Sequence, residues 1–424
     1  MNETYDFSYF QGNSLSDLFA PDLTDARYAF ILNYPATASW AVYPNNKKYY
    51  LQDGSDEATK TPYEKISQQE PWKNLAVLGE SIPGIVIRSP RNLLIEYWQE
   101  HFGFSYSNME VMQRSVYLDY LSQNDRFEKL ITLFPFDHLH AKKHAVDPEV
   151  HYRLLSKATL NQLGVSCPTY QSYNLHQTPL EKIQLPEQFP YLIKTSHGLS
   201  GEGTYIIRNN RDLDYCLREI EKYLEIQLLD TIVVSEFIRN TVQNYCVQFY
   251  VNKAGNITLI GATSQLVSPE GNYLGGLIHY RDIQMSKFYE MIAAIGKYAH
   301  QQGYFGVIGF DVLETEEGKL YAIDANFRVN GSTPLCLQRH TLLGAGKEVA
   351  KYSSDYQMDG TLDAILDTLQ PELKRKDFMI LSALEKVKYG KIYTALYGIV
   401  AGESIADMQR IEEQLHKKGL QLIN

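Results

Sequence analysis

The alternation of hydrophobic and polar residues is most informative between residues 309 and 333, which read GFDVLETEEGKLYAIDANFRVNGST. Two apolar runs flank a polar stretch that ends in Gly318, a pattern typical of two β-strands joined by a tight turn. If Glu317 and Gly318 form a two-residue turn, the strand register places Asp311 directly opposite Asp324. The segment is therefore predicted to be a β-hairpin that carries a pair of facing carboxylates.

Side chains on the second strand of this hairpin alternate between two faces. One face is predicted to carry Asp324, Asn326 and Arg328. The other is predicted to be a core face that carries Tyr321, Ile323, Ala325 and Phe327. Asp311, Asp324 and Asn326 supply hard oxygen ligands of the kind that Mg²⁺ prefers, and a cation would relieve the repulsion between the aspartates. Arg328 could bind a phosphoryl group bidentately. The alternative is a solvated hairpin with scattered acids, but the polar residues interrupt a core-type strand on one face only.

The chain as a whole is predicted to form three units with an α+β organisation. In residues 1–147 short strands alternate with helices, which is typical of a small α/β layer domain; strands are expected at 28–32, 76–78 and 85–87, and a helix from residue 92. Residues 148–345 are expected to contain helices at 151–163, 212–228 and 287–302 and strands at 191–194, 205–207, 231–238, 245–251 and 257–260. Residues 346–424 are expected to form a small α+β lobe with strands at 378–384, 392–400 and 420–423 and a helix at 404–418.

A glycine-rich segment follows the strand predicted at residues 191–194. Lys194 ends this strand, and the next residues, from Ser196 onward, include Gly198, Gly201 and Gly203 with Ser and Thr between them. Backbone amides in such a loop can approach an anion closely. The lysine precedes the glycines and a strand follows them, so the segment is not a P-loop. Phosphate binding and a plain flexible hairpin tip both remain open.

Two other segments carry candidate binding groups for a nucleotide. Arg153 and Lys157 lie four residues apart and are predicted to share a helix face, although such a basic pair is most often solvated. The apolar strand at residues 231–238 ends in Ser-Glu-Phe-Ile. Its last three residues, Glu236, Phe237 and Ile238, could present backbone groups to an adenine edge.

Residues 271–282, GNYLGGLIHYRD, are predicted to form a glycine-rich loop that carries His279 and Arg281. A lone histidine in such a loop is more often structural than catalytic. Near the C-terminus a basic stretch consists of Lys374, Arg375, Lys376, Lys386, Lys388 and Lys391. Such a stretch is usually a solvated face, and the other interpretation is a docking surface for an acidic partner.

Composition limits the classes of function. The chain has 424 residues and a formal net charge of −10, which disfavours nucleic-acid binding because phosphate recognition requires a basic face. Its four cysteines are spread singly, so they are predicted to be buried thiols in a reducing compartment. The first residues lack the features of a signal peptide, and no apolar run approaches the roughly 18 residues of a membrane span. A cytoplasmic protein that does not contact a membrane is expected.

The order of these motifs resembles the ATP-grasp ligase superfamily. The order is a basic helix, a strand ending in lysine, a glycine-rich loop, a strand ending in Ser-Glu-Phe-Ile, and then Asp311 followed by Asp-x-Asn-x-Arg. The resemblance covers residues 148–333 and implies two α+β lobes that hold ATP between them. The tail NFRVNGSTP, residues 326–334, is similar to that of the pheganomycin-type peptide ligases, whose relatives include the butirosin-pathway enzyme that loads glutamate onto an acyl carrier protein.

This resemblance implies roles for individual residues. Asp311, Asp324 and Asn326 resemble ligands of two Mg²⁺ ions, and Arg328 resembles the arginine that holds the transferred phosphoryl group. The residues implied to bind ATP are Lys194, the loop residues Ser196, Gly198, Gly201 and Gly203, Arg153 with Lys157 as its rival, Glu236, Phe237, Ile238 and Asn244. Those implied to contact the substrate are His279, Arg281, Arg328, Asn330, Gly331 and Ser332.

The sequence departs from the family pattern at two places. Asp324 stands where the family commonly has Glu, and Gln243 and Asn244 stand where an acidic residue that binds the ribose is expected. The second difference puts the sugar contacts in doubt more than it does catalysis.

The resemblance implies an ATP-dependent ligase that activates an amino acid, with L-glutamate the first expectation, as an acyl phosphate and releases ADP. The acyl group would pass to an acyl carrier protein thiol or to an amine, in the biosynthesis of an antibiotic or another secondary metabolite. A dipeptide ligase and a nucleotide-binding module without catalysis are the alternatives. The second is disfavoured because a pure binder does not need the arginine of phosphoryl transfer.

Overall fold

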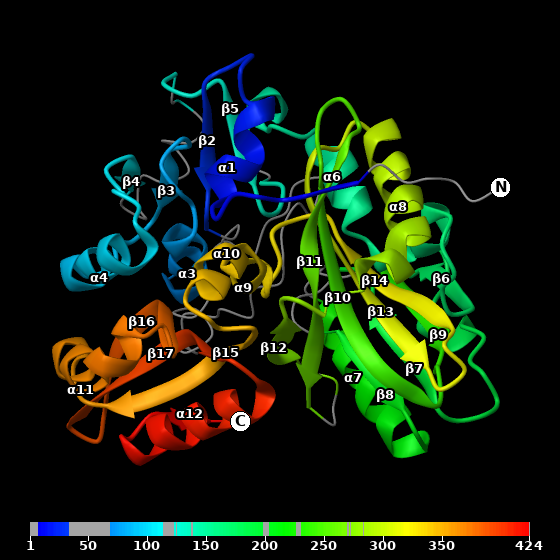
Figure 1. The fold of residues 1–424 in the computed structure, drawn as a ribbon. Helices are drawn as coiled ribbons and strands as arrows, with labels where there is room; N and C mark the ends of the chain where they lie inside the picture. Colours follow the sequence, from blue (N-terminus) through cyan, green and yellow to red (C-terminus); the bar gives the residue numbers. More distant parts are fainter. Residues whose placement is uncertain are drawn as a thin grey trace.

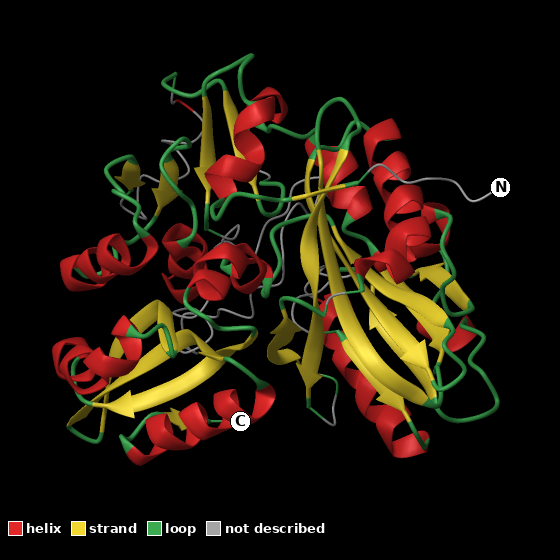
Figure 2. Cartoon of the chain, viewed as in Figure 1, coloured by secondary structure: helices red, strands yellow, loops and turns green. Residues whose placement is uncertain are grey.

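The computed structural model describes residues 7–33, 68–112, 123, 125–136, 139–197, 203–225, 230–268, 271, 273–282 and 284–423. Helices and strands occur together in every part of the chain, which confirms the predicted α+β class (Figure 2). The N-terminal part and the C-terminal lobe lie on one side of the molecule, and the strands of the central part lie on the other (Figure 1).

The N-terminal part is built on a parallel sheet of four strands in the order β4-β3-β2-β5. The strands are β2 (Tyr28–Ile31), β3 (Gly84–Val86), β4 (Met109–Val111) and β5 (Lys129–Thr132). Its helices are α1 (Leu15–Phe19), α3 (Glu70–Ala76) and α4 (Asn92–Phe102), with 3₁₀ turns at Ala20–Asp22 and Ala141–Lys143. The strand predicted at residues 76–78 is wrong: this apolar run is the buried end of α3 and the turn after it, and a short apolar run does not distinguish a strand from a buried helix.

A small antiparallel sheet in the central part has the order β6-β9-β7-β8. It consists of β6 (Tyr170–Asn174), β7 (Tyr191–Thr195), β8 (Thr204–Ile207) and β9 (Thr231–Glu236), with a 3₁₀ turn at Leu180–Lys182. Helix α7 (Asn210–Glu225) covers this sheet, and its Cys216 and Ile220 share a buried core with Ile193 and Ile207. The strand that ends near Lys194 was predicted correctly.

The helix predicted at residues 151–163 is divided into two pieces. Helix α6 (Pro148–Leu154) begins after Asp147, whose side chain accepts hydrogen bonds from two backbone amides, and a 3₁₀ segment spans Lys157–Leu163. Between them Ser156 accepts a hydrogen bond from the backbone N–H of Ala158 and so caps the second piece. The basic pair at positions 153 and 157 therefore does not share one helix face as the spacing predicted.

The large sheet has ten strands in the order β14-β13-β10-β11-β12-β15-β17-β16, with β1 beside β11 and β18 beside β15. Their bounds are β1 (Ser8–Tyr9), β10 (Thr241–Val251), β11 (Ile257–Val267), β12 (Tyr273–His279), β13 (Gly306–Thr315), β14 (Leu320–Asn326), β15 (Val349–Asp359), β16 (Phe378–Lys388), β17 (Lys391–Gly402) and β18 (Gln421–Leu422). The accompanying helices are α8 (Tyr289–Gln301), preceded by a 3₁₀ turn at Met285–Phe288, α9 (Thr333–Leu337), α10 (Arg339–Gly344), α11 (Leu362–Lys374) and α12 (Ile405–Lys417). Because β12 pairs with β15, this sheet continues across residue 345, where two units were predicted to divide.

Strand β12 occupies the segment that was predicted to be a glycine-rich loop. Gly275 has φ +149°, and a Cβ atom there would lie 2.1 Å from the backbone oxygen of Tyr352. The glycines thus permit a close approach of β12 to β15 and do not mark a loop.

The N-terminal part packs against the C-terminal lobe through α4. The Trp98 indole Nε1–H donates to the backbone oxygen of Ile380 on β16 at 3.0 Å, and the Tyr97 hydroxyl accepts from the backbone N–H of the same residue at 3.0 Å. Gln69, just before α3, donates to the backbone oxygen of Ala395 on β17. These contacts hold α4 and the start of α3 against β16 and β17 of the large sheet. In the described residues no helix has the length and hydrophobicity of a transmembrane span.

Candidate active site

One cavity collects side chains from the small sheet, the large sheet and the segment after β14. Its charged and amide-bearing lining includes Lys157, Lys194, Asn244, Asp311, Asp324, Asn326, Arg328 and Asn330. Gly331 and Ser332 also line it. Most residues predicted to act on phosphate, metal and substrate are therefore neighbours in space.

The hairpin of β13 and β14 places the two aspartates opposite each other, as predicted, although the register near its tip differs. Leu320 pairs with Glu314, one position away from the partner that a two-residue turn implies. An irregularity in the ladder, in which Ile323 has no partner, compensates for this shift and restores the pairing of Asp311 with Asp324. Ile323 lines the cavity, so its prediction as a core residue is wrong.

The two aspartates form an acidic pair whose one ion pair in the described residues, with Lys157, is long. Removal from water and the nearby Asp324 carboxylate raise the pKa of Asp311 to about 7. Gln265 Nε2 donates to Asp311 Oδ1 at 2.5 Å, and the nearest cation to Asp324 is Lys157, whose Nζ lies 3.9 Å from Oδ2. Such a pair favours binding of a cation between the carboxylates.

The oxygens at this point fit Mg²⁺. Asp311, Asp324 and Asn326 supply two carboxylates and an amide oxygen, and Mg²⁺ completes its shell with water and substrate phosphates. Among the described residues no group of three His, Cys, Asp or Glu side chains could hold a metal ion by itself. A metal here would therefore depend on the amide and on the oxygens of a bound ligand.

Two lysines lie beside the acidic pair. Lys194 is buried, its Nζ donates to the backbone oxygen of Ile323 at 3.0 Å, and burial lowers its pKa. Lys157 is held by its backbone, whose N–H donates to the Ser196 oxygen at 2.8 Å. The irregular position of Ile323 thus turns a carbonyl toward Lys194. Both ammonium groups could offset the charge of phosphate groups.

Arg328 has hydrogen-bonding capacity left over. Its Nη2 donates to Asn326 Oδ1 at 2.8 Å and its Nη1 to the backbone oxygen of Val329 at 3.1 Å. Its Nε is buried and has no hydrogen-bond partner in the described part of the chain. The guanidinium carbon lies 5.1 Å from the centre of the Phe134 ring, which restricts its position. The arginine could therefore accept an anionic ligand without breaking an ion pair.

The glycine-rich loop is described only at its two ends. Ser196 is buried, and its hydroxyl lies 3.0 Å from His197 Nδ1, while the His197 ring stacks on Tyr152 at 4.1 Å. Gly203 has φ +71°, and a Cβ atom there would lie 2.0 Å from Thr195 Oγ1. Gly198 and Gly201 lie outside the described residues. The role of the loop in phosphate binding stays a prediction.

The residues predicted to bind adenine and ribose are only partly in the cavity. Asn244 lines it, and its buried Oδ1 has no hydrogen-bond partner in the described residues. Glu236, at the end of β9, accepts a hydrogen bond from the Thr169 backbone N–H at 2.8 Å. It does not line the cavity, and neither do Phe237 and Ile238.

Three predicted residues lie away from the cavity. Arg153 is exposed and donates to Gln302 Oε1 at 2.5 Å, so Lys157 and not Arg153 reaches the acidic pair. Arg281 forms an ion pair with Glu348 at 2.6 Å. His279 Nδ1 lies 3.7 Å from Asp282 Oδ2 at the edge of a separate cavity.

The basic stretch near the C-terminus does not form one patch. Its first three residues lie around the end of α11 and its last three around the turn between β16 and β17. Strand β16 has 11 residues, which separates the two groups by roughly 35 Å. Arg375 is also engaged with Asp377 and Glu372. The stretch as a whole therefore gives no support to the docking of an acidic partner.

The structure adds residues that the sequence did not indicate. Gln265 and Tyr273 come from β11 and β12, Tyr352 and Ser354 from β15, and Glu70 and Lys73 from α3 of the N-terminal part. These segments are separated by long stretches of sequence, and no local motif marks them. Only tertiary packing brings them to the cavity.

Comparison with known proteins gives consistent findings. The family model described as L-aspartate–L-methionine ligase, ATP grasp, matches residues 168–326. The [butirosin acyl-carrier protein]–L-glutamate ligase of Niallia circulans is 21% identical over 319 residues, which cover 69% of this chain and 74% of the relative.

Two solved structures show the same fold at low identity. The L-amino acid ligase from Bacillus licheniformis matches with a TM-score of 0.51 at 12% identity, over 78% of this chain and 95% of that chain. The biotin carboxylase from Campylobacter jejuni, in a β-γ-ATP complex, matches with a TM-score of 0.55 at 12% identity, over 94% and 92%. Together with the sequence matches, they confirm the resemblance predicted from the motifs: the chain has the ATP-grasp fold and is an ATP-dependent ligase similar to the ATP-grasp ligases.

Proposed function

We propose that this ligase activates the carboxylate of an amino acid as an acyl phosphate and then transfers the acyl group to a thiol or an amine. The observation that carries the proposal is the arrangement of charges in one cavity. Asp311 and Asp324 face each other, two lysines lie beside them, and Arg328 has an unused buried N–H. This set provides for phosphates, a divalent cation and a transferred phosphoryl group together.

Each group has a defined task in this reaction. Lys157 and Lys194 offset the charge of the ATP phosphates, and Asn244 lies where a sugar or base could be bound. Asp311, Asp324 and Asn326 would hold Mg²⁺, with two ions expected, and the metal supplies charge neutralisation on the phosphate oxygens. Arg328 donates hydrogen bonds to the γ-phosphoryl oxygens, where negative charge must be stabilised during transfer.

The chemistry proceeds in two displacements. A carboxylate oxygen of the substrate bonds to the γ-phosphorus while the bond from that phosphorus to the bridging oxygen breaks, so ADP leaves and an acyl phosphate forms. The thiol or amine then attacks the acyl carbon and phosphate leaves. The nucleophile loses its proton to solvent in this second step.

L-Glutamate is the first choice of substrate, and a carrier-protein thiol is the first choice of acceptor. The support is that the curated relative is named for L-glutamate and an acyl carrier protein, and the matching family for L-aspartate and L-methionine. The second candidate is a dipeptide ligase with a free amino acid as acceptor, which the fold of the L-amino acid ligase favours. The pathway proposed is antibiotic or other secondary-metabolite biosynthesis in the cytoplasm.

The test measures ADP release from Mg-ATP with each of the twenty amino acids in the presence and absence of hydroxylamine. Hydroxylamine traps an acyl phosphate as a hydroxamate. One acid that gives both ADP and hydroxamate is the expected result. Formation of AMP, or no turnover with any amino acid, would contradict the proposal.

The acceptor is identified in a second experiment with the activated acid. Mass spectrometry then compares a phosphopantetheinylated acyl carrier protein with free amino acids as acceptors. Acylation of the carrier thiol supports the first candidate, and a dipeptide product supports the second.

A further inference from the structure

Helix α3 brings a charged pair of the N-terminal part into the wall of the active-site cavity. Glu70 and Lys73 both line it, together with Arg328 and Gly331. Lys73 Nζ donates to Glu70 Oε2 at 2.5 Å. These residues are far in sequence from the motifs of the ATP-grasp domain, and none of the tasks described above uses them.

The two members of this pair are not equally accessible. The side chain of Lys73 is 3% exposed and that of Glu70 is 16% exposed. The Lys73 ammonium group also lies 5.7 Å from the centre of the Tyr352 ring and 5.9 Å from that of Tyr397, so its charge is surrounded by favourable partners. The carboxylate of Glu70 is therefore the more accessible charge of the pair at the cavity wall.

Stability alone does not account for this pair. A buried ion pair pays a desolvation penalty, and replacing it with packed apolar residues is often neutral or stabilising. A carboxylate held at the wall of a ligand cavity by a buried lysine, which is itself flanked by two aromatic rings, has the properties of a preorganised binding group.

The cavity also contains Arg328, which attracts ligand groups of the opposite charge to those that Glu70 attracts. Arg328 attracts carboxylate and phosphoryl oxygens, whereas Glu70 attracts a cation. An amino acid carries one carboxylate and one ammonium group, so the two residues match its two charges. Tyr273 and Tyr352 line the same cavity and could contact the apolar part of such a substrate.

Building on the proposed function, we propose that Glu70 binds the ammonium group of the amino acid whose carboxylate is activated. Lys73 is a positioning residue that fixes the Glu70 carboxylate. The N-terminal part thus selects substrates with a free amino group and rejects acids that lack its positive charge.

The experiment uses the hydroxylamine assay on the full chain, because it needs only ATP and the activated acid and no natural acceptor. The amino acid that gives the most hydroxamate is compared with its N-acetyl derivative. The wild-type chain is expected to prefer the free amino acid by about 10- to 100-fold in kcat/KM, the range of one hydrogen bond to a charged group. Glu70→Gln is expected to raise the KM for the amino acid by a similar factor, leave the KM for ATP unchanged, and abolish the preference.

Further variants separate binding from folding. Lys73→Met is expected to raise the KM for the amino acid while kcat changes little, and Lys73→Arg to restore most of the affinity because it keeps the ion pair. Glu70→Asp keeps the charge and should give an intermediate KM even if Glu70→Gln does not fold. Glu96→Gln changes an exposed glutamate of α4 outside the cavity and is the matched control, with wild-type kinetics expected.

Two outcomes would overturn the inference and leave the ligase function intact: equal use of the N-acetyl acid by the wild-type chain, or an unchanged KM for the amino acid in Glu70→Gln. The second outcome would assign Glu70 to the acceptor side or to structure. Absence of hydroxamate with every amino acid would overturn the proposed function and this inference with it.

Discussion

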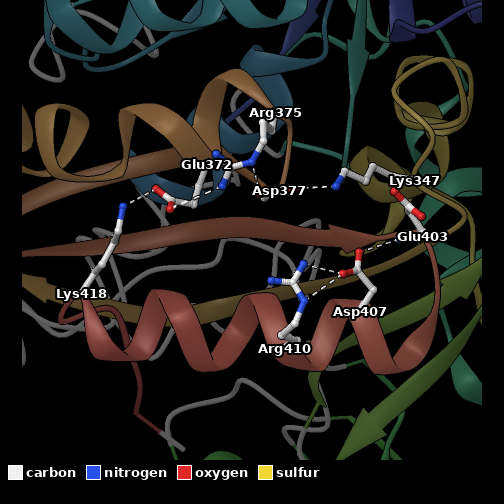
Figure 3. A network of polar contacts seen from close by, with 8 residues as sticks. All are labelled: Lys347, Glu372, Arg375, Asp377, Glu403, Asp407, Arg410 and Lys418. Atoms are coloured by element: carbon white, nitrogen blue, oxygen red, sulfur yellow. Dashed lines mark hydrogen bonds and ion pairs between the residues drawn. The ribbon is translucent and has the colours of Figure 1, made fainter.

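Two clusters of charged side chains in this molecule are built in opposite ways. In the C-terminal lobe, Lys347, Asp377, Arg375, Glu372 and Lys418 form a lobe network in which acids and bases alternate (Figure 3). Its contacts from Lys347 to Asp377, from Arg375 to Asp377 and from Lys418 to Glu372 are 2.5, 2.8 and 2.7 Å long. Both carboxylates of the lobe network have a cation on either side.

The cavity cluster, made of Asp311, Asp324, Lys157, Lys194 and Arg328, places like charges together. Its aspartates face each other across a ladder, both lysines line the same cavity, and the contact from Lys157 Nζ to Asp324 Oδ2 is 3.9 Å long. The pKa of the Asp311 carboxyl is raised to about 7 and the pKa of Lys194 is lowered, in both cases mainly by burial.

The difference separates structure from function. The lobe network contains its own counter-charges, so it can stabilise the fold without a ligand. The cavity cluster, in contrast, lacks part of its counter-charges among the side chains that the structure describes. A bound cation between the aspartates and an anionic ligand beside the lysines and Arg328 would supply them. Substitutions are therefore expected to affect unfolding free energy in the first cluster and turnover in the second.

The largest effect is expected when the lobe network loses its central acid. Asp377→Ala leaves the Lys347 ammonium, on a side chain only 10% exposed, without its partner, and breaking a buried pair costs about 3–5 kcal/mol. The unfolding free energy from urea titration should fall by this amount, while kcat/KM of the folded fraction stays at the wild-type value.

Asp363→Ala is the matched control for this substitution. Asp363 lies in the first turn of α11, its side chain is 60% exposed, and its contact with Arg91 is 3.5 Å long. An exposed pair of this kind contributes at most about 1 kcal/mol. Equal destabilisation by both substitutions would show that the lobe network is not the source of the effect.

Arg328→Ala is the corresponding change in the cavity cluster. Loss of a charged donor to the transferred phosphoryl group is expected to lower kcat by roughly 10²- to 10³-fold, by analogy with the loss of an oxyanion donor. The Kd for ATP should change little, because the lysines contact the other phosphates. Isothermal titration with ATP and steady-state kinetics separate the two effects, and equal loss of both would show that Arg328 only positions the nucleotide.

A buried histidine that contacts Phe327, the neighbour of Arg328 in sequence, adds a pH dependence to stability. His151 Nε2 lies 2.8 Å from the backbone oxygen of Phe327, and burial lowers the pKa of this histidine to about 4. Below pH 6.5 this histidine binds a proton in the unfolded chain but not in the native state. Its contribution to the unfolding free energy is therefore complete above this pH and is lost as the pH falls toward 4. The shift corresponds to about 3 kcal/mol.

Urea titrations between pH 7 and pH 4 measure this loss. His151→Gln, which cannot take up a proton, is expected to flatten the curve by about 3 kcal/mol relative to wild type over this range. An unchanged slope would mean that other groups, such as the buried His144, dominate the acid response.

The sequence was sufficient for the local parts of the cavity cluster and insufficient for its long-range parts. Alternation and turn residues predicted the facing aspartates, because a hairpin joins neighbours in sequence. They did not predict the irregularity at Ile323, which depends on the packing of the hairpin and changes the face of that side chain. The pairing of Asp311 with Asp324 was correct because two one-residue deviations cancel.

Segments far apart in sequence were harder to place. The spacing of Arg153 and Lys157 indicated one helix face, but the cap at Ser156 divides the helix and sends the two side chains in different directions. Glycines at positions 275 and 276 resembled a loop because sequence does not show that β15 approaches them closely. Glu70 and Lys73 had no motif at all, and only the packing of α3 against the large sheet places them at the cavity.

Asp311→Asn is a substitution in the cavity cluster that is expected to raise stability while it removes activity. It removes one of two facing carboxylates, so the folded chain without ATP and metal is expected to gain roughly 1–2 kcal/mol of unfolding free energy near pH 8. Turnover should be lost in the same variant because an amide is a poorer ligand for a divalent cation than a carboxylate. A urea titration with chelator, together with the hydroxamate assay, measures both, and a loss of stability would show that the acidic pair is not a source of strain.

The smallest effect is expected at the edge of the C-terminal lobe. Arg410 donates to Asp407 Oδ1 at 2.6 Å on α12, but its side chain is 58% exposed, so solvent screens the pair. Arg410→Ala is expected to change the unfolding free energy by no more than the error of a urea titration and to leave kcat and ATP binding at wild-type values. It is therefore also the arginine control for Arg328→Ala. A loss of stability as large as that of Asp377→Ala would mean that this exposed pair is coupled to the buried lobe network beside it in Figure 3 and that the two act as one unit.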